Sequence, residues 1–399
     1  MWPYIICFLI TLLFAYKNEQ ALKAFDTKKS SRNVVILTGI FTVLFPAILA
    51  GCRDFRVGTD VQVYALQTFE NVQYAHSILD LFVIDSQYQE SSIEIGYQIL
   101  AYISSLFSDD PHIFLFFISL FIGVFVYLIL YRMRKICSMF MGQVVYLFCC
   151  YNETLNMMRQ CMAMVMILYA LTFLLENKSP VKCLVIFVAS YFFHHSALIG
   201  LALLLPVILL TREKVQYQTK KQMRWVLVMA IGFSFIMANF FSLAGFFIST
   251  NDIFAERYDH YLTDTQNTGS SGIRLTFYYF VVYLMLYLDR KKMKYGYVFL
   301  TYAILDFIFY FLRMKQVYLY RISDFFFYCR IMGLSVIPVY ALTDKSRYRL
   351  MKYGKILFLF LFWLLYFGGE GNLNGTNNSR KIGGANETMP YISDILDIQ

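Results

Sequence analysis

Charged residues are scarce in this sequence. They make up only 15% of its 399 residues, whereas soluble globular domains carry about 25%. Apolar residues account for 59% of the chain, and its mean hydropathy is +0.54. This composition excludes an ordinary soluble enzyme, a disordered chain and a disulfide-stapled secreted domain.

The signatures of several common sites are also absent. The eight cysteines are scattered apart from the pair Cys149-Cys150, and no CxxC or Cys/His spacing typical of a metal site occurs. We therefore expect no disulfide framework, no metal and no cofactor. The lack of a Walker loop or GxGxxG motif argues against ATP-driven pumping by this chain alone.

Long apolar runs take the place of these features. In lipid, such runs must satisfy their backbone hydrogen bonds internally, which favours helices. The sequence therefore predicts an all-α, polytopic membrane bundle of about 12 transmembrane helices. The candidate crossings are residues 2–16, 34–50, 112–131, 139–151, 161–175, 183–193, 197–210, 225–248, 275–288, 295–312, 322–342 and 356–367.

Basic residues concentrate in alternate loops, beginning with the loop between residues 17 and 32. The positive-inside rule makes these loops cytoplasmic. The alternation holds only if the apolar segment 93–107, which carries Glu94 and Gln98, does not cross the membrane. We expect that segment to form one interfacial or re-entrant helix, and both chain termini to be extracytoplasmic.

This scheme also predicts the domain organisation. Residues 1–368 would form a single transmembrane catalytic domain, with outer loops at 51–92 and 249–272, and residues 369–399 an extracytoplasmic tail. The segment 2–16 has no basic residue before it, so we expect a retained helix rather than a cleaved signal peptide.

Some arginines depart from the positive-inside rule. Ionisable groups at membrane depth are costly and usually face a cavity or a partner, and a guanidinium forks onto phosphate oxygens. Converging arginines would therefore bind a diphosphate, although each could instead pair with a nearby acid, as Arg53 with Asp54, or extend to lipid headgroups. The leading candidates are Arg56, Arg159, Arg321 and Arg274.

Candidate proton acceptors accompany these arginines. His194 ranks first because histidine titrates near neutrality, and Asp60 and Glu94 follow. Each has a structural alternative: His194 as a turn residue, Asp60 as a helix cap and Glu94 as an ordinary carboxylate at a helix N-terminus. The pair His194-His195 lacks a third ligand at metal spacing.

Aromatic and amide side chains in the outer segments are candidates for contacts with a sugar, because rings stack and amides hydrogen-bond. They are Tyr64, Gln160 and Tyr258. The loop 249–272, which contains Tyr258 and a Gly-Ser run, could serve as a lid, although a plain polar connector explains it equally well.

Four motifs follow one another along the chain: R-x-G-T-D-x3-Y at 56–64, E-x-G-Y at 94–97, M-R-Q-x-x-A at 158–163 and F-H-x-S-A-L at 193–198. Their order resembles the EpsG family of Wzy-type polymerases of bacterial exopolysaccharide and capsule. R-I-S-D-F-F at 321–326 and M-P-Y at 389–391 resemble two further family segments. Phe325 stands where the family more often has Tyr, and the terminal segment is loosely spaced.

The resemblance implies a metal-independent membrane glycosyltransferase, GT-C-like, in the bacterial cytoplasmic membrane. Its substrate would be an undecaprenyl-diphosphate-linked oligosaccharide, polymerised at the outer face into a capsule, exopolysaccharide or O-antigen. Membrane lipids, a chain-length regulator and a flippase of the same pathway would be its partners, and no nucleic acid. The diphosphate already activates the donor sugar, which agrees with the missing nucleotide motif.

Three other functions stay open from the sequence. A flippase of lipid-linked oligosaccharides would also have about 12 spans and a diphosphate site, and Asp306 and Arg330 inside the predicted spans are the residues most compatible with transport. An O-antigen ligase shares the same arginines. A membrane acyltransferase would need a donor-binding pattern that the sequence does not show.

Overall fold

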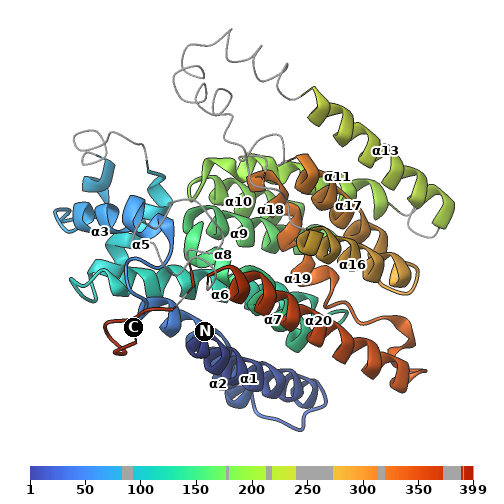
Figure 1. Ribbon diagram of the computed structural model, residues 1–399, viewed down its shortest axis with the longest axis horizontal. Helices are drawn as coiled ribbons and strands as arrows, with labels where there is room; N and C mark the ends of the chain where they lie inside the picture. Colours follow the sequence, from blue (N-terminus) through green and yellow to red (C-terminus); the bar gives the residue numbers. More distant parts are fainter. Residues whose placement is uncertain are drawn as a thin grey trace. The chain divides into compact units, whose positions relative to one another are not determined.

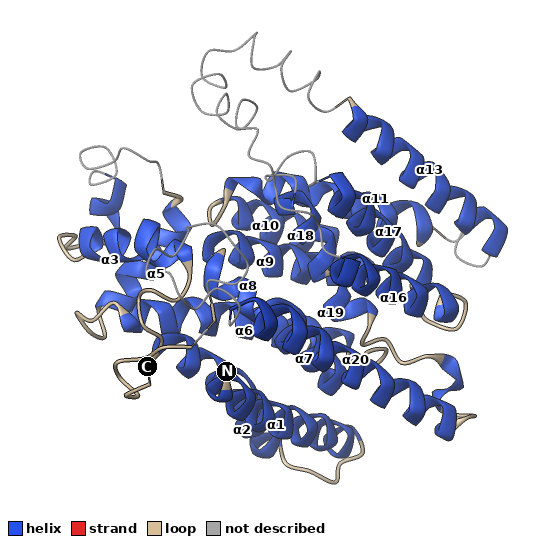
Figure 2. Cartoon of the chain, in the orientation of Figure 1, coloured by secondary structure: helices blue, strands red, loops and turns tan. Residues whose placement is uncertain are grey.

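The structure is a computed structural model that describes residues 1–82, 93–176, 179–212, 218–239, 273–312, 320–371, 388–389 and 391–398. Within these ranges the chain forms helices and no strand (Figure 2). The described residues divide into two compact units, one made of Met1–Leu198 with Asp344–Gln399 and the other of Ile199–Thr343 (Figure 1).

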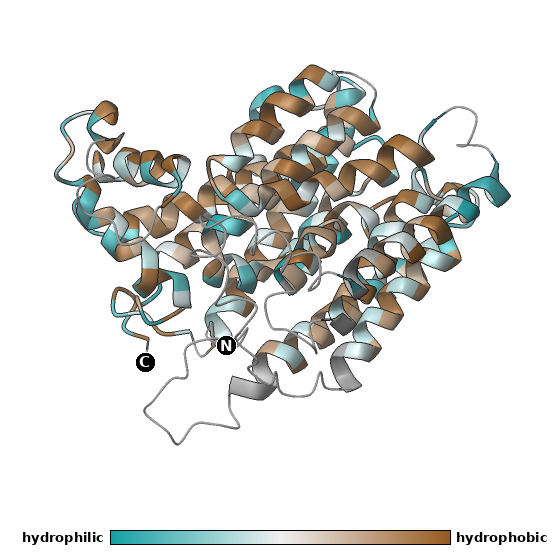
Figure 3. Cartoon of the chain, turned by 90° about the horizontal axis from the view of Figure 1, so that it is seen from above, coloured by the Kyte–Doolittle hydropathy of each residue, from teal (hydrophilic) through white to brown (hydrophobic). Residues whose placement is uncertain are grey.

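Five helices in the described part of the chain are long and apolar enough to cross a membrane. They are α1 (Trp2–Asp26), α2 (Arg32–Gly51), α6 (His112–Met133), α9 (Met158–Leu175) and α20 (Lys345–Gly371), the last over Lys345–Phe367. Figure 3 shows hydrophobic residues along the helices of the described chain and hydrophilic residues mainly near helix ends and in loops. The expected all-helical membrane fold is confirmed, whereas the number of about 12 crossings stays a prediction.

In the first unit the long helices pack in a chain of pairs: α1 on α2, α2 on α6, and α6 on α9, which also contacts α10 (Pro180–Tyr191). Between α6 and α9 lie α7 (Met139–Val145), the π-helix η3 (Tyr146–Cys150) and α8 (Tyr151–Asn156). α9 is the most buried of the five long helices, so a side chain in its first turn is held by surrounding elements.

Hydrogen bonds between polar side chains and neighbouring helices join the elements of this unit. Asn18 of α1 donates to the backbone carbonyl of Val35 at 2.8 Å and to Thr38 Oγ1 at 2.9 Å. Glu19 accepts hydrogen bonds from Ser138 Oγ at 2.6 Å and from the backbone N–H of Phe140 at 2.9 Å. These bonds fix α1 against α2 and α7, because an unmatched polar group among apolar helices is costly.

The segment between α2 and α6 forms short helices. They are the π-helix η1 (Val61–Ala65), α3 (Leu66–Val72), η2 (Ile78–Asp80) and α5 (Ile95–Ser105), and α5 packs on α3 and α6. α5 has 11 residues, whereas a transmembrane helix needs about 20. Its length fits the interfacial or re-entrant helix that the sequence predicts at 93–107.

The C-terminal segment returns to the start of the chain (Figure 1). Tyr4 Oη donates to the carbonyl of Thr388 at 2.7 Å, and Tyr391 Oη donates to the carbonyl of Leu49 at 2.8 Å. The backbone N–H of Asp54 donates to the carbonyl of Ile392 at 2.8 Å. The described end of the chain therefore packs on the loop that follows α2, and the side of the membrane it faces stays a prediction.

In the second unit α17 (Gly296–Leu312) contacts most of its neighbours. These are α11 (Leu201–Leu210), α13 (Thr219–Ala238), α16 (Ile273–Asp289), α18 (Tyr320–Tyr328) and α19 (Arg330–Gly333). The predicted crossing at 322–342 is not one continuous helix: it breaks near Cys329, and Pro338 precedes the short helix η6 (Val339–Ala341). Arg330 and Ser323 both bind Asp306 of α17, which holds α18 and α19 against α17 on either side of this break.

Candidate functional site

The loop after α2 is held against the junction of α8 and α9. Gly58 has φ +97°, and a Cβ there would lie 2.1 Å from the carbonyl oxygen of Leu155, so this position requires glycine. The backbone N–H of Thr59 donates to Asn156 Oδ1 at 2.7 Å. The motif at 56–64 therefore lies beside the start of α9, where the motif at 158–163 begins.

A second close backbone contact joins the other two motifs of this unit. The N–H of Gly96 donates to the carbonyl of Phe192 at 2.7 Å, and a Cβ at Gly96 would lie 2.7 Å from that same oxygen. Glycine thus lets the first turn of α5 approach the turn at 192–196. Four motifs that are distant in sequence meet at one place in the first unit.

Arg159 lies at the centre of this meeting point. Its Nη1 is 2.7 Å from Glu94 Oε2, and its guanidinium lies 3.9 Å from the ring centroid of Tyr64. The side chain is 12% exposed. A cation in the first turn of a helix is opposed by the helix dipole, so the neighbouring carboxylate offsets both burial and the dipole.

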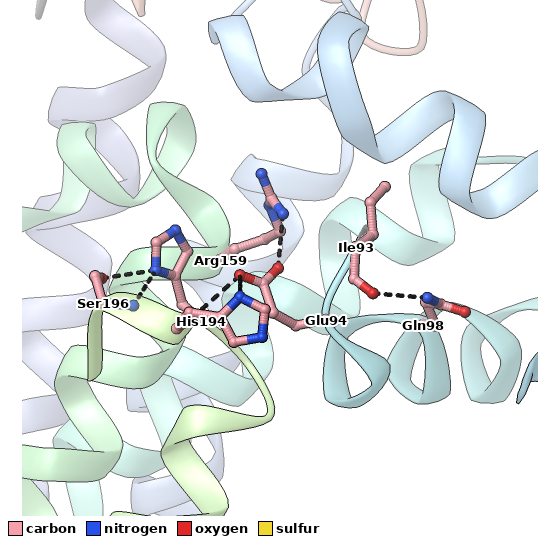
Figure 4. Close-up of polar contacts among 7 residues, drawn as sticks. Ile93, Glu94, Gln98, Arg159, His194 and Ser196 are labelled. Atoms are coloured by element: carbon pink, nitrogen blue, oxygen red, sulfur yellow. Dashed lines mark hydrogen bonds and ion pairs between the residues drawn. The ribbon is translucent and has the colours of Figure 1, made fainter. Parts of the chain in front are cut away.

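Glu94 uses both carboxylate oxygens (Figure 4). Oε2 accepts from Arg159, while Oε1 accepts the backbone N–H of His195 at 3.3 Å and lies 3.7 Å from His195 Nδ1. Burial by itself raises the pKa of Glu94, but the charges of Arg159 and His194 outweigh burial and the pKa is lowered. Glu94 is therefore an ionised group whose hydrogen-bonding capacity is largely committed.

His194 is oriented by its own turn. Ser196 Oγ lies 2.6 Å from His194 Nδ1, and the backbone N–H of Ser196 donates to the same nitrogen at 3.1 Å. His194 also interacts electrostatically with Glu94. The turn thus places the imidazole beside the Glu94–Arg159 pair (Figure 4).

Tyr64 lies in the π-helical segment η1, and Asp60 directly precedes that segment. Asp60 precedes η1, but its side chain makes no capping hydrogen bond. Its negative charge acts on Arg159 and on Tyr97; burial first and then Asp60 raise the pKa of Tyr97. π-helical turns often occur at functional sites, and this one presents Tyr64 to Arg159.

The arginines of the loop after α2 differ from expectation. Arg56, rather than Arg53, pairs with Asp54, with Nε 2.7 Å from Oδ1 and Nη2 2.9 Å from Oδ2. The hydrogen bond from Arg56 holds the pKa of Asp54 at about 2. Arg53 is buried and donates to the carbonyl of Leu155 at 3.3 Å and to Met158 Sδ at 3.2 Å. Arg53 therefore fastens the loop to the α8–α9 junction.

The remaining predicted residues lie elsewhere or outside the described chain. Gln160 is buried in α9 next to Arg159, and Arg321 lies in α18 of the second unit. Arg274 is in the first turn of α16, with its side chain outside the described part, and Tyr258 lies outside the described residues. The binding roles of these residues stay predictions.

Sequence reasoning missed two members of the cluster. Tyr97 is fully buried, its ring centroid lies 6.0 Å from the Arg159 guanidinium, and its hydroxyl has no hydrogen-bond partner within the described residues. His195 contacts Glu94 through its backbone and ring. The motif E-x-G-Y contains Tyr97, and the doubled histidine was the signal for His195.

No group of three His, Cys, Asp or Glu residues that could hold a metal ion occurs in the described part of the chain. Metal independence is not tested by this observation and stays a prediction.

The sequence model of the EpsG family matches residues 36–378, which is most of the chain. The protein therefore belongs to the EpsG family, which confirms the family expected from the sequence. The segment 389–391 lies outside the matched residues, and its resemblance stays a prediction. Neither a curated protein nor a solved structure matches the chain. Membership indicates a polysaccharide polymerase-type role in a membrane.

Proposed function

Because the chain belongs to the EpsG family, we propose that it polymerises undecaprenyl-diphosphate-linked oligosaccharide repeat units into a surface polysaccharide. The reaction takes place at the outer face of the bacterial cytoplasmic membrane, in a GT-C-like bundle of about 12 crossings. Membrane lipids surround the protein, and a flippase and a chain-length regulator of the same pathway are its proposed partners.

One observation carries this proposal. Arg159, whose side chain is 12% exposed, lies at the start of α9 between a carboxylate, Glu94, and an aromatic ring, Tyr64. A guanidinium is suited to phosphate oxygens, and a ring beside it is suited to a sugar face. The cluster therefore combines groups for both parts of a lipid-diphosphate sugar, and it is assembled from four motifs of the family.

The proposed step is a glycosyl transfer. A hydroxyl oxygen of the incoming repeat unit forms a bond to the anomeric carbon of the growing chain, and the bond from that carbon to the diphosphate oxygen breaks. The hydroxyl proton passes to a basic side chain of the cluster, and the lipid diphosphate leaves with the bonding electrons. Arg159 stabilises the negative charge that develops on the leaving group.

Further residues have proposed roles in the same step. Arg56 is the second candidate for the diphosphate, and its approach requires that it exchange Asp54 for phosphate oxygens, which its 56% exposed side chain permits. Arg321 and Arg274 are further diphosphate candidates. Gln160 and Tyr258 are proposed to contact the sugars.

Purified protein in liposomes with a defined lipid-linked repeat unit tests the function. A ladder of products supports polymerase activity; movement of the unit between leaflets without new bonds indicates a flippase; and transfer of one chain to a different acceptor indicates a ligase. Arg159→Ala is expected to remove the ladder, because the leaving group loses its cation. Arg349→Ala, which changes an exposed arginine of α20, is the matched control and is expected to keep it.

A further inference from the structure

The turn that holds His194 constrains where the imidazole carries its proton. The backbone N–H of Ser196 donates to His194 Nδ1 over 3.1 Å. A backbone amide is always a donor, so the nitrogen that it faces must offer a lone pair. In a neutral imidazole the single proton then resides on the other nitrogen, Nε2.

We propose that His194 acts in the polymerase reaction as an Nε2–H hydrogen-bond donor to the departing diphosphate, and that the Asp60 carboxylate is the group that accepts the hydroxyl proton. This inference rests on the proposed function and reverses the order expected from sequence, in which His194 ranks first as the general base. A general base needs a lone pair on the nitrogen that faces the substrate. Because the Ser196 amide donates to the lone pair of Nδ1, the proton of the neutral ring is on Nε2, and that nitrogen has no lone pair to accept a proton.

The Ser196 hydroxyl does not change this assignment. Its Oγ lies 2.6 Å from Nδ1, and a hydroxyl rotates to donate or accept as needed. The backbone amide has no such freedom. A proton on Nδ1 would therefore point toward a second donor and lose one hydrogen bond, so the turn favours the Nε2–H form.

The surroundings of His194 suit a donor. In Figure 4 the nitrogen opposite Ser196 lies on the Arg159 side of the imidazole. Arg159 and the Nε2–H would then present a cation and a neutral donor to the same anion. Oxyanion-type donors of this kind typically contribute about 10²–10³ in rate.

Of the two carboxylates described in the cluster, Asp60 is better suited than Glu94 to accept the hydroxyl proton. Both oxygens of Glu94 already accept hydrogen bonds, one from Arg159 and one from the backbone of His195. The charge of Asp60 acts on Arg159 and on Tyr97, so its carboxylate lies within the same cluster. In the proposed step the hydroxyl proton moves to Asp60 and the hydroxyl oxygen forms a bond to the anomeric carbon. The bond from that carbon to the diphosphate oxygen breaks, and the lipid diphosphate leaves while accepting hydrogen bonds from Arg159 and His194.

Three substitutions of His194 distinguish a hydrogen-bond donor from a general base at this position. The side-chain amide nitrogen of Gln occupies the place of Nε2, whereas that of Asn occupies the place of Nδ1. For a donor, His194→Gln is expected to lose less than about tenfold in polymerisation rate, while His194→Asn and His194→Ala lose about 100-fold or more. His194→Gln falling as far as His194→Ala would overturn the donor role.

The pH dependence of the polymerisation rate and the ¹⁵N NMR spectrum are two further measurements, and a purely structural role of His194 would not affect them in this way. His194→Gln is expected to keep the acid limb of the wild-type pH–rate profile, and Asp60→Asn to lose it. In protein labelled with ¹⁵N-histidine, the signals that disappear in His194→Gln belong to His194, and they are expected to show a protonated Nε2 and a bare Nδ1. A protonated Nδ1 in the neutral ring overturns the inference whatever the activity.

The two proposals fail in different ways. Wild-type protein that forms no ladder in liposomes overturns the polymerase function and with it the role of His194. Wild-type protein that forms a ladder, combined with a His194→Gln variant as inactive as His194→Ala, overturns only the donor role.

Discussion

Arg159 and Glu94, 65 residues apart in sequence, form a part-buried ion pair that joins two motifs, with 2.7 Å between Nη1 and Oε2. The side chains are 12% and 5% exposed. The pair therefore does two things: it keeps a cation at the start of α9, and it ties α5 to α9. The two contributions can be separated by experiment. The cation at the start of α9 is lost when the two charges are exchanged, whereas an ion pair between α5 and α9 is retained.

Exchanging the two charges tests this separation. Glu94→Gln alone is expected to lower the free energy of unfolding by about 3–5 kcal/mol, because a buried charge is left without its partner. The double variant Glu94→Arg with Arg159→Glu is expected to regain part of that stability and no polymerisation, since the cation has moved away from the leaving group. Thermal unfolding in detergent and the liposome ladder measure the two effects.

Recovery of polymerisation in the exchanged variant would contradict the assignment of Arg159 to the diphosphate. The single variant Arg159→Lys is the conservative comparison: it keeps the charge but loses the forked geometry, and it is expected to retain stability better than activity.

Gly58 is the glycine whose replacement is expected to disturb the site most directly. Gly58→Ala places a methyl group 2.1 Å from the Leu155 carbonyl oxygen at φ +97°. Strain of this kind costs about 1–3 kcal/mol, and the loop that carries Asp60 and Tyr64 must shift. We expect lower thermal stability together with a loss of polymerisation.

Gly354→Ala in α20 is the matched control, because among the described residues no heavy atom beyond the adjacent residues and the helix's own backbone lies within 4 Å of a Cβ there. An alanine inside a helix is expected to stabilise it by about 0.5–1 kcal/mol. Equal behaviour of the two variants would show that the close contact at Gly58 does not hold the loop in place.

Asp54 gives the loop after α2 a pH dependence. Its pKa is lowered to about 2, chiefly by the hydrogen bond from Arg56. A lowered pKa in the folded state contributes stability at pH values above the ordinary aspartate pKa of about 3.9, and this contribution is lost as the pH falls toward about 2. The stability difference between wild type and Asp54→Asn is therefore expected to be constant above about pH 5 and to shrink below it.

Unfolding temperatures measured across this range test the expectation. Because the Arg56 side chain is 56% exposed, added salt is expected to reduce the difference. A difference that grows as the pH falls would place the stabilising effect on another group.

Much of the fold was predictable because most of the five long helices coincide with long apolar runs. Hydropathy alone located α1, α2, α6 and α9 within a few residues at their starts, and α5 was separated from them by its polar residues. The break near Cys329 was not predicted, because the run 322–342 is apolar on average although it contains Asp324, Arg330 and Pro338. Ser323 and Arg330 on either side of the break bind Asp306, a residue from another helix, and the sequence of the run does not specify that contact.

The sequence predicted which residues belong to the site better than it predicted the contacts they make. Arg159, Glu94, Asp60 and His194 were identified as chemically suited residues, and the structure brings them together. The pairing of Arg56 with Asp54 and the orientation of His194 by Ser196 depend on backbone turns. Side-chain type and spacing do not specify those turns, so the donor role of His194 was not visible in the sequence.

Asp306 and Arg330 offer the last test, which concerns transport. They form an ion pair in the second unit, 0% and 2% exposed, with the Arg330 guanidinium 4.4 Å from the ring centroid of Tyr279. Removing one partner in Asp306→Ala is expected to destabilise the unit by about 3–5 kcal/mol, whereas Asp306→Leu with Arg330→Met is expected to be neutral or stabilising. If the pair is structural, the double variant keeps the liposome ladder. If the pair carries an ion or a proton for transport, the double variant folds but loses the movement of lipid-linked units between leaflets, and the flippase function would then replace the polymerase as the better account of this unit.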